Sequence, residues 1–281
     1  MLQNSFLHIP GIGLKTEEKL WQAGLTEWRQ AVVPGGFPIP VRKRLLFTDC
    51  LHESMDQLRN RNLLFFERRM PSFAHWRFFM EFREETAFLD IETDGLDSEN
   101  GMITTIALYD GRRLRHYVNG HNLEAFPGDL RGYKLLVTYN GKCFDIPFIE
   151  RYFRIRIHQA QIDLRHVLAG LGFKGGLKRC EAALGIHRGV LKDVDGWIAP
   201  LLFQEYRRNR NAAALETLLA YNMADAINLE ALMVIAHNRH IEGTPFVLTH
   251  RIPEPTRPQN PFQADRRIIE TIQSRNVSGW A

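Results

Sequence analysis

The segment TAFLDIETDGL, Thr86 to Leu96, decides the fold and carries the first candidate site. It is mostly apolar and partly β-branched and ends at the turn-forming pair Asp94-Gly95, so it predicts a buried strand. Side chains two apart on a strand share a face, which places Asp90 and Glu92 together. Neighbouring carboxylates repel unless a cation compensates them, and an all-oxygen ligand set favours Mg²⁺ or Mn²⁺ over Zn²⁺. The alternative is an ordinary strand end whose acids face water.

A second strand-like run, LLVTY at 135–139, leads into the turn Asn140-Gly141, and a helix is predicted from Phe144 onward. Asp145 therefore lies where the carboxyl end of a strand meets a helix. Such crevices are where α/β sheets place ligands. The alternative role for Asp145 is a helix N-cap.

A third segment, residues 215–236, has apolar residues at helical spacing with no internal Gly or Pro, and it predicts one long helix or two abutting ones. Tyr221 and Asp225 are four residues apart and fall on one face. A phenol one turn from a carboxylate can hold a water that the carboxylate's metal also binds. The alternative is that Tyr221 is a core residue with its hydroxyl at the rim.

These segments resemble the DEDD superfamily of 3′–5′ exonucleases, which has a ribonuclease H-like fold, and within it most closely the YprB-type family. Asp90, Glu92 and Leu96 match its first motif, Asp-x-Glu followed by a turn and Leu. Asn140, Phe144 and Asp145 match the second, Asn-x-x-x-Phe-Asp. Tyr221 and Asp225 match the third, Tyr-x-x-x-Asp. Residue 220 is Ala where the other subclass has His, so the tyrosine subclass is the better match. GGLKRCEAALGIHR, residues 175–188, also resembles the YprB-type family.

The resemblance covers residues 84 to 240, approximately, and implies an α/β fold built on a mixed five-stranded sheet with helices on both sides. Strand-like runs agree with it, at 86–92, 102–109, 113–118, 134–139 and 160–163. The turn pair Asp110-Gly111 predicts a hairpin between the second and third runs.

The resemblance further implies a 3′–5′ exonuclease that hydrolyses phosphodiester bonds with two Mg²⁺ or Mn²⁺ ions, about 4 Å apart. One ion would activate the attacking water, and the other would stabilise the departing 3′ oxygen. Asp90 would bridge both ions, Tyr221 would position the water, and Glu92, Asp145 and Asp225 would complete the metal shells. The substrate would be DNA or RNA with a single-stranded 3′ end.

Other positions near these motifs receive narrower expectations. Leu96 would wedge against the terminal base, with a core residue closing the turn as the alternative, and Asn140 would also contact nucleic acid. Lys178 belongs to a basic cluster that reaches phosphates only if it borders the acidic pocket. Asp163 follows a strand-like run and is expected to cap a helix outside the metal set. His237 and His240 are at helical spacing and are expected in a solvated last helical turn, with a ligand pair as the alternative.

The N-terminal segment HIPGIGLKTEEKLWQAGL, residues 8–25, resembles a helix-hairpin-helix module. The hairpin is predicted at 10–13 and its second helix at 16–22. Gly11 and Gly13 let the backbone approach a phosphate, exposed N–H groups at a helix start attract anions, and Lys15 adds charge. The alternative is a purely structural hairpin.

Four units are predicted along the chain: a hairpin module at 1–35, a helical connector at 36–83, the nuclease domain at 84–243, and a Pro-rich strap with a final helix at 244–281. In the connector, arginines alternate with aromatic residues, a composition that suits single-stranded nucleic acid. The alternative is a small helical subdomain whose aromatics form its core.

Composition fits these expectations without deciding among them. The chain has 281 residues, a net charge of +4 and a pI near 9.0, which favours a polyanionic partner only weakly. Three cysteines without C-x-x-C spacing suit a reducing cytoplasm. We expect no apolar run long enough to span a bilayer and no signal peptide. GFKGGLK at 172–178 lacks the Gly-Lys-Ser/Thr ending of a phosphate loop, so no nucleotide cofactor is expected.

Two alternatives to the exonuclease remain open at this point. One is a nucleic-acid-binding or scaffold protein with a weak or inactive ribonuclease H-like domain. The other is a structure-specific endonuclease acting through the same acidic residues.

Overall fold

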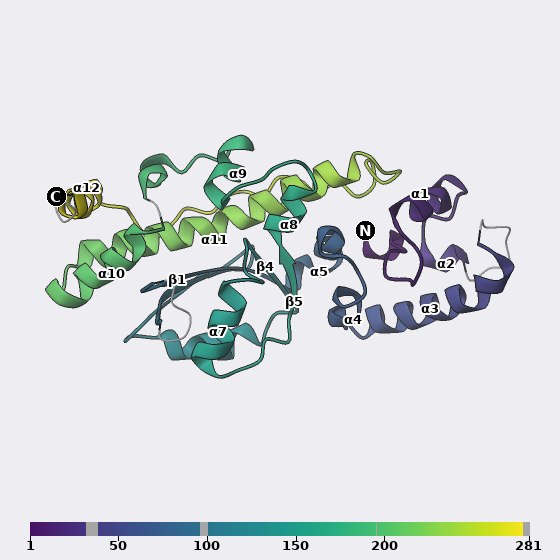
Figure 1. Cartoon of the computed structure of the whole chain (residues 1–281), viewed down its shortest axis with the longest axis horizontal. Helices are drawn as coiled ribbons and strands as arrows, with labels where there is room; N and C mark the ends of the chain where they lie inside the picture. Colours follow the sequence, from purple (N-terminus) through teal and green to yellow (C-terminus); the bar gives the residue numbers. More distant parts are fainter. Residues whose placement is uncertain (32–38, 96–100, 195, 278–281) are drawn as a thin grey trace.

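The structure is a computed structural model that describes residues 1–31, 39–95, 101–194 and 196–277. The molecule is elongated, with the N-terminal helices at one end, a sheet in the middle and the C-terminal helix at the other end (Figure 1). The thirty-residue helix α11 (Ala212–Ile241) runs along most of this length. It is therefore the element that connects the candidate site to the rest of the fold.

The sheet has the strand order β3-β2-β1-β4-β5. The strands are β1 (Thr86–Thr93), β2 (Ile103–Tyr109), β3 (Leu114–Val118), β4 (Leu135–Thr138) and β5 (Ala160–Asp163). β1 pairs antiparallel with β2 and parallel with β4, so the sheet is mixed, as the sequence predicts. The β2–β3 hairpin turns at Asp110, whose carboxylate accepts from the backbone N–H groups of Arg112 and Arg113.

Helices cover both faces of the sheet, and the alternation along β1 decides which side chain faces which helix. Ala87, Leu89 and Ile91 pack in one cluster with α6 (Phe126–Leu130) and α7 (Asp145–Phe153). Phe88 belongs to the other cluster, which contains residues of α11 (Figure 1). Because side chains two apart share a face, Asp90 and Glu92 point to the α11 side as well.

α11 is a single uninterrupted helix rather than two abutting ones, and it begins at a capping residue, Asn211, whose side chain accepts from Ala213 N at 3.2 Å. By length and composition α11 could cross a membrane, so the expectation that no apolar run is long enough was wrong. However, 89% of its most apolar window is buried inside the protein, because α11 packs against the sheet on one side and other helices on the other.

The last turns of α11 are also buried, contrary to the expected solvated histidine pair. His237 has no exposed surface, and its Nε2 lies 2.9 Å from the backbone carbonyl of His250. His240 stacks on Trp76 with ring centroids 5.0 Å apart. The two imidazoles therefore serve packing, because the connector and the strap cover this end of the helix.

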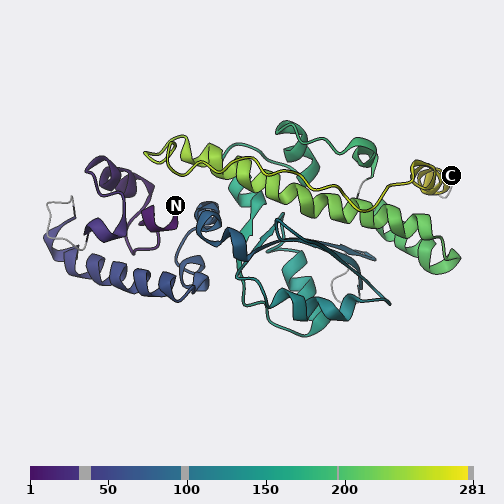
Figure 2. The same cartoon turned by 180° about the vertical axis from the view of Figure 1, so that it is seen from behind.

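The Pro-rich strap lies along α11 rather than hanging free (Figure 2). The side chain of Asn238 both donates to the carbonyl of Ile252 at 2.8 Å and accepts from its N–H at 2.9 Å. Further along, Asn260 Nδ2 donates to the carbonyl of Ala220 at 2.8 Å. The strap thus runs antiparallel to the helix and leads to α12 (Arg266–Val277), the predicted final helix.

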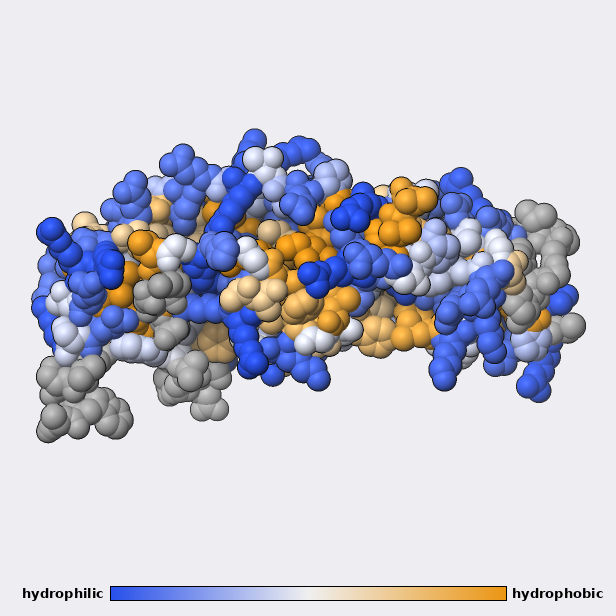
Figure 3. Space-filling model, turned by 90° about the horizontal axis from the view of Figure 1, so that it is seen from above, coloured by the Kyte–Doolittle hydropathy of each residue, from blue (hydrophilic) through white to orange (hydrophobic). Residues whose placement is uncertain are grey.

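Shorter helices complete the domain around α11 and the sheet. They are η4 (Leu123–Ala125), α8 (Leu164–Ala169), α9 (Leu177–Ala183), η5 (Gly189–Asp193) and α10 (Ile198–Asn209). α9 and the segment after it lie over α11, on the side away from the sheet (Figure 1). Figure 3, seen from this side, shows hydrophobic residues gathered in the middle of the face between hydrophilic ends.

The N-terminal helices and the connector form one packed unit. Its elements are η1 (Leu2–Asn4), α1 (Leu14–Gln22), α2 (Trp28–Ala31), α3 (Val41–Arg59), α4 (Leu63–Glu67), η2 (Ser72–Phe78), α5 (Phe79–Phe82) and η3 (Arg83–Glu85). α1 begins two residues before the predicted start, and only the three-residue η1 precedes the hairpin where a full module has a helix. The connector's Phe66, Phe78 and Phe79 are fully buried, which confirms the core alternative for these aromatics.

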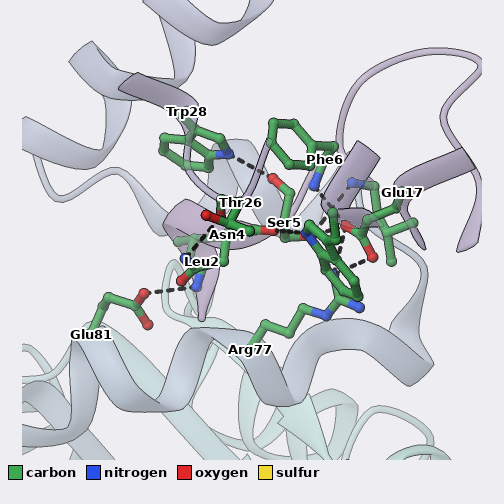
Figure 4. Close-up of polar contacts among 11 residues, drawn as sticks. Leu2, Asn4, Ser5, Phe6, Glu17, Thr26, Trp28, Arg77 and Glu81 are labelled. Atoms are coloured by element: carbon green, nitrogen blue, oxygen red, sulfur yellow. Dashed lines mark hydrogen bonds and ion pairs between the residues drawn. The ribbon is translucent and has the colours of Figure 1, made fainter. Parts of the chain in front are cut away.

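A buried ion pair joins the hairpin unit to the connector (Figure 4). The carboxylate of Glu17, on α1, lies 2.8 Å from Nη1 of Arg77, on η2, and both side chains are at most 5% exposed. Glu17 also accepts from Phe6 N at 2.7 Å and from Ser5 Oγ at 3.0 Å. Each oxygen of this buried carboxylate is therefore matched by a donor.

Candidate metal centre

Three carboxylates from two distant segments come together at the middle of the molecule. Asp90 and Glu92 extend from β1 toward α11, and Asp225 extends from α11 toward β1. One carboxylate oxygen from each lies within 4.8 Å of the other two. A β-bulge directly after Glu92 shifts the register with β2, an irregularity that often re-aims side chains beside active sites. This trio, Asp90, Glu92 and Asp225, is called the acidic cluster below.

Asp145 lies beside the acidic cluster but is not one of its three converging oxygen donors. It is the first residue of α7, and the N-cap position belongs to Phe144, so the N-cap alternative does not apply. Its Oδ1 accepts from the N–H of Ile91 at 3.3 Å, which directs the carboxylate at the strand between Asp90 and Glu92. The fourth predicted acid is therefore adjacent to the cluster and held by β1.

Electrostatics identify the cluster as short of positive charge. Burial, followed by repulsion from Asp225, holds the pKa values of Asp90 and Glu92 well above their ordinary range. Burial also raises the pKa of Asp145 to about 7 and that of Asp225 to about 6, although the guanidinium of Arg188 lowers the latter. A divalent cation would relieve all four groups at once, and carboxylate oxygens are the ligands that Mg²⁺ and Mn²⁺ prefer.

Tyr221 lies one turn before Asp225 on α11, and its side chain is buried near the acidic cluster. Burial and the negative charges of Asp225, Glu92 and Asp90 raise the pKa of its phenol. Two cations flank the ring, with Lys178 Nζ 5.5 Å and the Arg188 guanidinium 5.8 Å from its centroid. Its hydroxyl therefore stays protonated next to the carboxylates.

The sequence-based interpretation missed two side chains that touch the acidic cluster. Asn222 Nδ2 donates to Asp90 Oδ2 at 2.6 Å and thereby fixes the rotamer of that carboxylate. Arg188 Nη1 lies 2.5 Å from Asp225 Oδ1. Asn222 could have been found from its place next to Tyr221 in the helix motif. Arg188 is the last residue of the segment 175–188 that resembles the YprB-type family, and that resemblance is the signal that could have found it.

The comparison with protein-family models agrees with this geometry. The family model of the RNase H superfamily, RNase_H_2, matches residues 87–237. The chain belongs to the RNase H superfamily. The matched region starts on β1 and ends near the end of α11, so it contains the acidic cluster, Asp145 and Tyr221. A comparison with curated proteins and one with solved structures each gave no match.

In this RNase H-like domain Asp163 has the capping role that the sequence predicts. Its Oδ1 accepts from Arg165 N at 3.0 Å at the start of α8 and from Asn140 N at 2.7 Å. Asn140 has a positive φ of 65°, uncommon for a residue other than glycine, and its side-chain oxygen accepts from Arg165 Nη1 at 2.6 Å. Asp163 thus shapes the turn that follows β4 instead of joining the acidic cluster.

The remaining predicted contact residues are spread over the molecule. Gly11, Gly13 and Lys15 are exposed at the hairpin before α1, and Gly11 adopts a φ of 81° that favours glycine. Lys178 lies at the start of α9, where it contacts the carbonyl of Val194 and the face of Tyr221. Leu96 is outside the described residues. The hairpin lies at the N-terminal end of the elongated molecule, whereas the acidic cluster is carried by β1 and α11 in its middle (Figure 1).

Proposed function

We propose that this RNase H superfamily member is a metal-dependent 3′–5′ exonuclease of the DEDD type, YprB-like and of the tyrosine subclass. The observation that carries the proposal is the convergence of Asp90, Glu92 and Asp225 within 4.8 Å. The polarity and the exonuclease class rest on the motif resemblance. The cluster's shortage of positive charge supports the metal requirement independently of any resemblance.

In this proposal the acidic cluster, with Asp145 beside it, holds two Mg²⁺ or Mn²⁺ ions. When bound, the ions lower the pKa of a water and neutralise charge on the leaving 3′ oxygen. Asn222 keeps the Asp90 carboxylate turned toward the cluster, and Ile91 N–H does the same for Asp145. The protonated Tyr221 hydroxyl donates to the attacking water and orients it.

A pocket at the carboxyl end of β4, with cations in its wall, supports a nucleic-acid substrate. It has a volume of about 640 Å³ and is lined by residues of the β4–α7 turn, α8 and the start of α9: Tyr139, Asn140, Arg165, Ala169, Lys174, Gly175, Gly176 and Leu177. Arg165 and Lys174 are exposed cations at its wall, and Tyr139 offers an aromatic ring. This combination suits a backbone phosphate and a stacked base of a single strand. In the proposal, the strand beyond the scissile bond occupies this pocket.

The exposed hairpin is proposed as a second, sequence-independent contact with the sugar-phosphate backbone. Its N–H groups at the start of α1 and the charge of Lys15 suit a phosphate. Deleting residues 1–31 would expose the connector core, so Lys15→Gln is the appropriate test. We expect it to weaken oligonucleotide binding a few-fold at low salt and leave turnover of bound substrate unchanged; equal affinity would leave the hairpin purely structural.

The boundaries of the units and the cellular location are predictions for the whole chain. The division into units at 1–35, 36–83, 84–243 and 244–281 stays a prediction, although the buried pair Glu17–Arg77 joins the first two rigidly. A cytoplasmic location is proposed because the three cysteines are free thiols.

The decisive experiment uses one oligonucleotide labelled at either end. With Mn²⁺ or Mg²⁺, the 5′-labelled single strand should shorten stepwise, whereas the 3′-labelled strand should release its label as a mononucleotide at once. Asp225→Ala should abolish both signals. Internal cuts would indicate an endonuclease, and binding without any cleavage in either metal would indicate a scaffold protein.

A further inference from the structure

A buried arginine occupies the acidic cluster, and the proposed mechanism does not use it. Arg188 precedes η5 in the segment that follows α9, and its side chain is only 4% exposed. Its Nη1 lies 2.5 Å from Oδ1 of Asp225, a member of the acidic cluster. A cation at that oxygen and a guanidinium at the same oxygen exclude one another, because both need the same lone pairs and they repel.

The other side of Arg188 is held by a second carboxylate. Its Nε contacts Glu181 Oε2, and the Glu181 side chain is 1% exposed. Glu181 Oε1 accepts in turn from Asn228 Nδ2 at 2.7 Å. Asp225 and Asn228 are three residues apart on α11, so the four side chains close a ring on one face of this helix. Arg188 is therefore shared between an acid of the cluster and an acid outside it.

The strap stabilises this arrangement from outside. Arg257 Nη1 donates to the carbonyl of His187, the residue before Arg188, at 3.3 Å. Yet the guanidinium remains incompletely paired, because its buried Nη2 makes no hydrogen bond within the described residues. Buried charged donors without acceptors are costly, so the pairing with Asp225 is a compromise that can be given up.

We propose that Arg188 is the built-in countercharge of the metal-free acidic cluster and sets its metal affinity by competing for Asp225. Glu181 is the second partner that retains Arg188 when a cation takes the carboxylate. Arg188 is thus a positioning residue that acts through Asp225. The inference rests on the proposed metal site and adds a competitor that makes metal binding weaker and reversible.

The test measures Mn²⁺ affinity of the full chain without nucleic acid, from the EPR signal of free Mn²⁺ after removal of metal by a chelator. Arg188→Met removes the charge and should tighten binding by about tenfold or more. Arg188→Lys keeps the charge and should stay within about threefold of the wild type. Arg251→Met, which removes an exposed charge from the same strap, should leave the affinity close to that of the wild type.

Glu181→Gln gives the opposite sign and completes the experiment. In this variant Asp225 is the remaining charged partner of Arg188, and a nearby negative charge is lost. Mn²⁺ binding should therefore weaken several-fold. If Arg188 were purely structural, Arg188→Met and Arg188→Lys would lose Mn²⁺ affinity equally. A folded Arg188→Met protein whose Mn²⁺ affinity is unchanged or weaker than that of the wild type overturns the inference. If Arg188→Met fails to fold, an unchanged affinity of Glu181→Gln overturns it instead.

The failure of the proposed function would look different. If neither the wild type nor Arg188→Met binds Mn²⁺, the metal site itself is wrong, and the competition falls with it. If the wild type does not bind Mn²⁺ but Arg188→Met does, the competition is confirmed and stronger than proposed. If both bind equally, the metal site stands and the role of Arg188 is refuted.

Discussion

Two regions of this protein bury carboxylates, and they do so in opposite ways. In the N-terminal unit Glu17 is fully buried, yet Arg77, Ser5 and the N–H of Phe6 satisfy it. In the RNase H-like domain Asp90, Glu92 and Asp225 face one another, and the guanidinium that lies at Asp225, that of Arg188, is shared with Glu181. The difference separates a structural acid from a functional one: the first has a complete set of partners, whereas the second is held in place but undersupplied with positive charge.

The substitution Asp90→Asn tests whether the acidic cluster is a functional site. We expect at least about a thousandfold loss of nuclease activity, equivalent to about 4 kcal/mol of lost transition-state stabilisation, because the cluster loses a metal ligand. Metal-free stability should not fall, since the substitution removes a carboxyl group whose ionisation is opposed by burial and by the neighbouring acids. Labelled-oligonucleotide cleavage and urea unfolding measure the two effects. The control is Asp94→Asn, an exposed acid of the following turn, which should keep near-normal activity.

The converse experiment is Glu17→Gln. Because it leaves the Arg77 guanidinium buried without the charge of its ion-pair partner, we expect a loss of about 3 kcal/mol or more in the free energy of unfolding. Glu18→Gln, an exposed neighbour on α1, should cost less than about 0.5 kcal/mol. Equal stabilities of the two variants in chemical denaturation would show that burial does not distinguish Glu17.

The pH dependence of stability gives a further test of the acids in the RNase H-like domain. Burial raises the pKa of Asp145 to about 7, so between about pH 4 and pH 7 the folded protein holds a proton that the unfolded chain releases. The bound proton raises the free energy of unfolding at low pH, and this contribution is lost as the pH rises from about 4 to about 7. The buried histidines have lowered pKa values and give the opposite trend, so the measurement compares the wild type with Asp145→Asn, where their contribution cancels.

Unfolding of both proteins in urea at pH 5 and pH 7.5, without metal, should show Asp145→Asn gaining about 2 kcal/mol over the wild type at the higher pH. Mn²⁺ should reduce that gain, because it binds the deprotonated wild-type site. A stability difference that is constant with pH would mean that Asp145 titrates as an ordinary carboxyl group.

The smallest expected effect concerns Tyr221. Phe at this position keeps the ring between Lys178 and Arg188 but removes the hydroxyl beside the carboxylates. We expect turnover to fall about tenfold, because the attacking water loses one orienting partner, with Mn²⁺ affinity within about twofold of the wild type. An unchanged turnover rate would assign Tyr221 to the core, like the aromatics of the connector.

Sequence patterns predicted those parts of the fold whose causes are local. Alternation along β1, uninterrupted helical spacing in α11 and the position of Asp163 after a strand are all readable from neighbouring residues. The strands and the mixed sheet are confirmed by the structure and by the family match. The convergence of Asp90, Glu92 and Asp225 was predictable only through the family resemblance that the three motifs carry, since nothing local relates them.

Long-range partners were not predictable for the same reason. Arg188 meets Asp225 only because α9 and the turn after it lie over α11, and His237 is buried only because the connector and the strap cover it. In each case a polar residue has the local appearance of a surface position. What decides its environment is the packing of segments that are remote in sequence.

The strap along α11 fits its helix with no spare length. Its two anchors on the helix, Asn238 and Ala220, are eighteen residues apart, which corresponds to about 27 Å of helix, and the eight steps from Ile252 to Asn260 cover about 26 Å when extended. The extended strap therefore just spans the distance between its two anchors on the helix that carries Tyr221 and Asp225. A one-residue deletion between the anchors should detach Asn260 from the turn next to Tyr221, whereas lengthening the loop before Ile252 should be harmless.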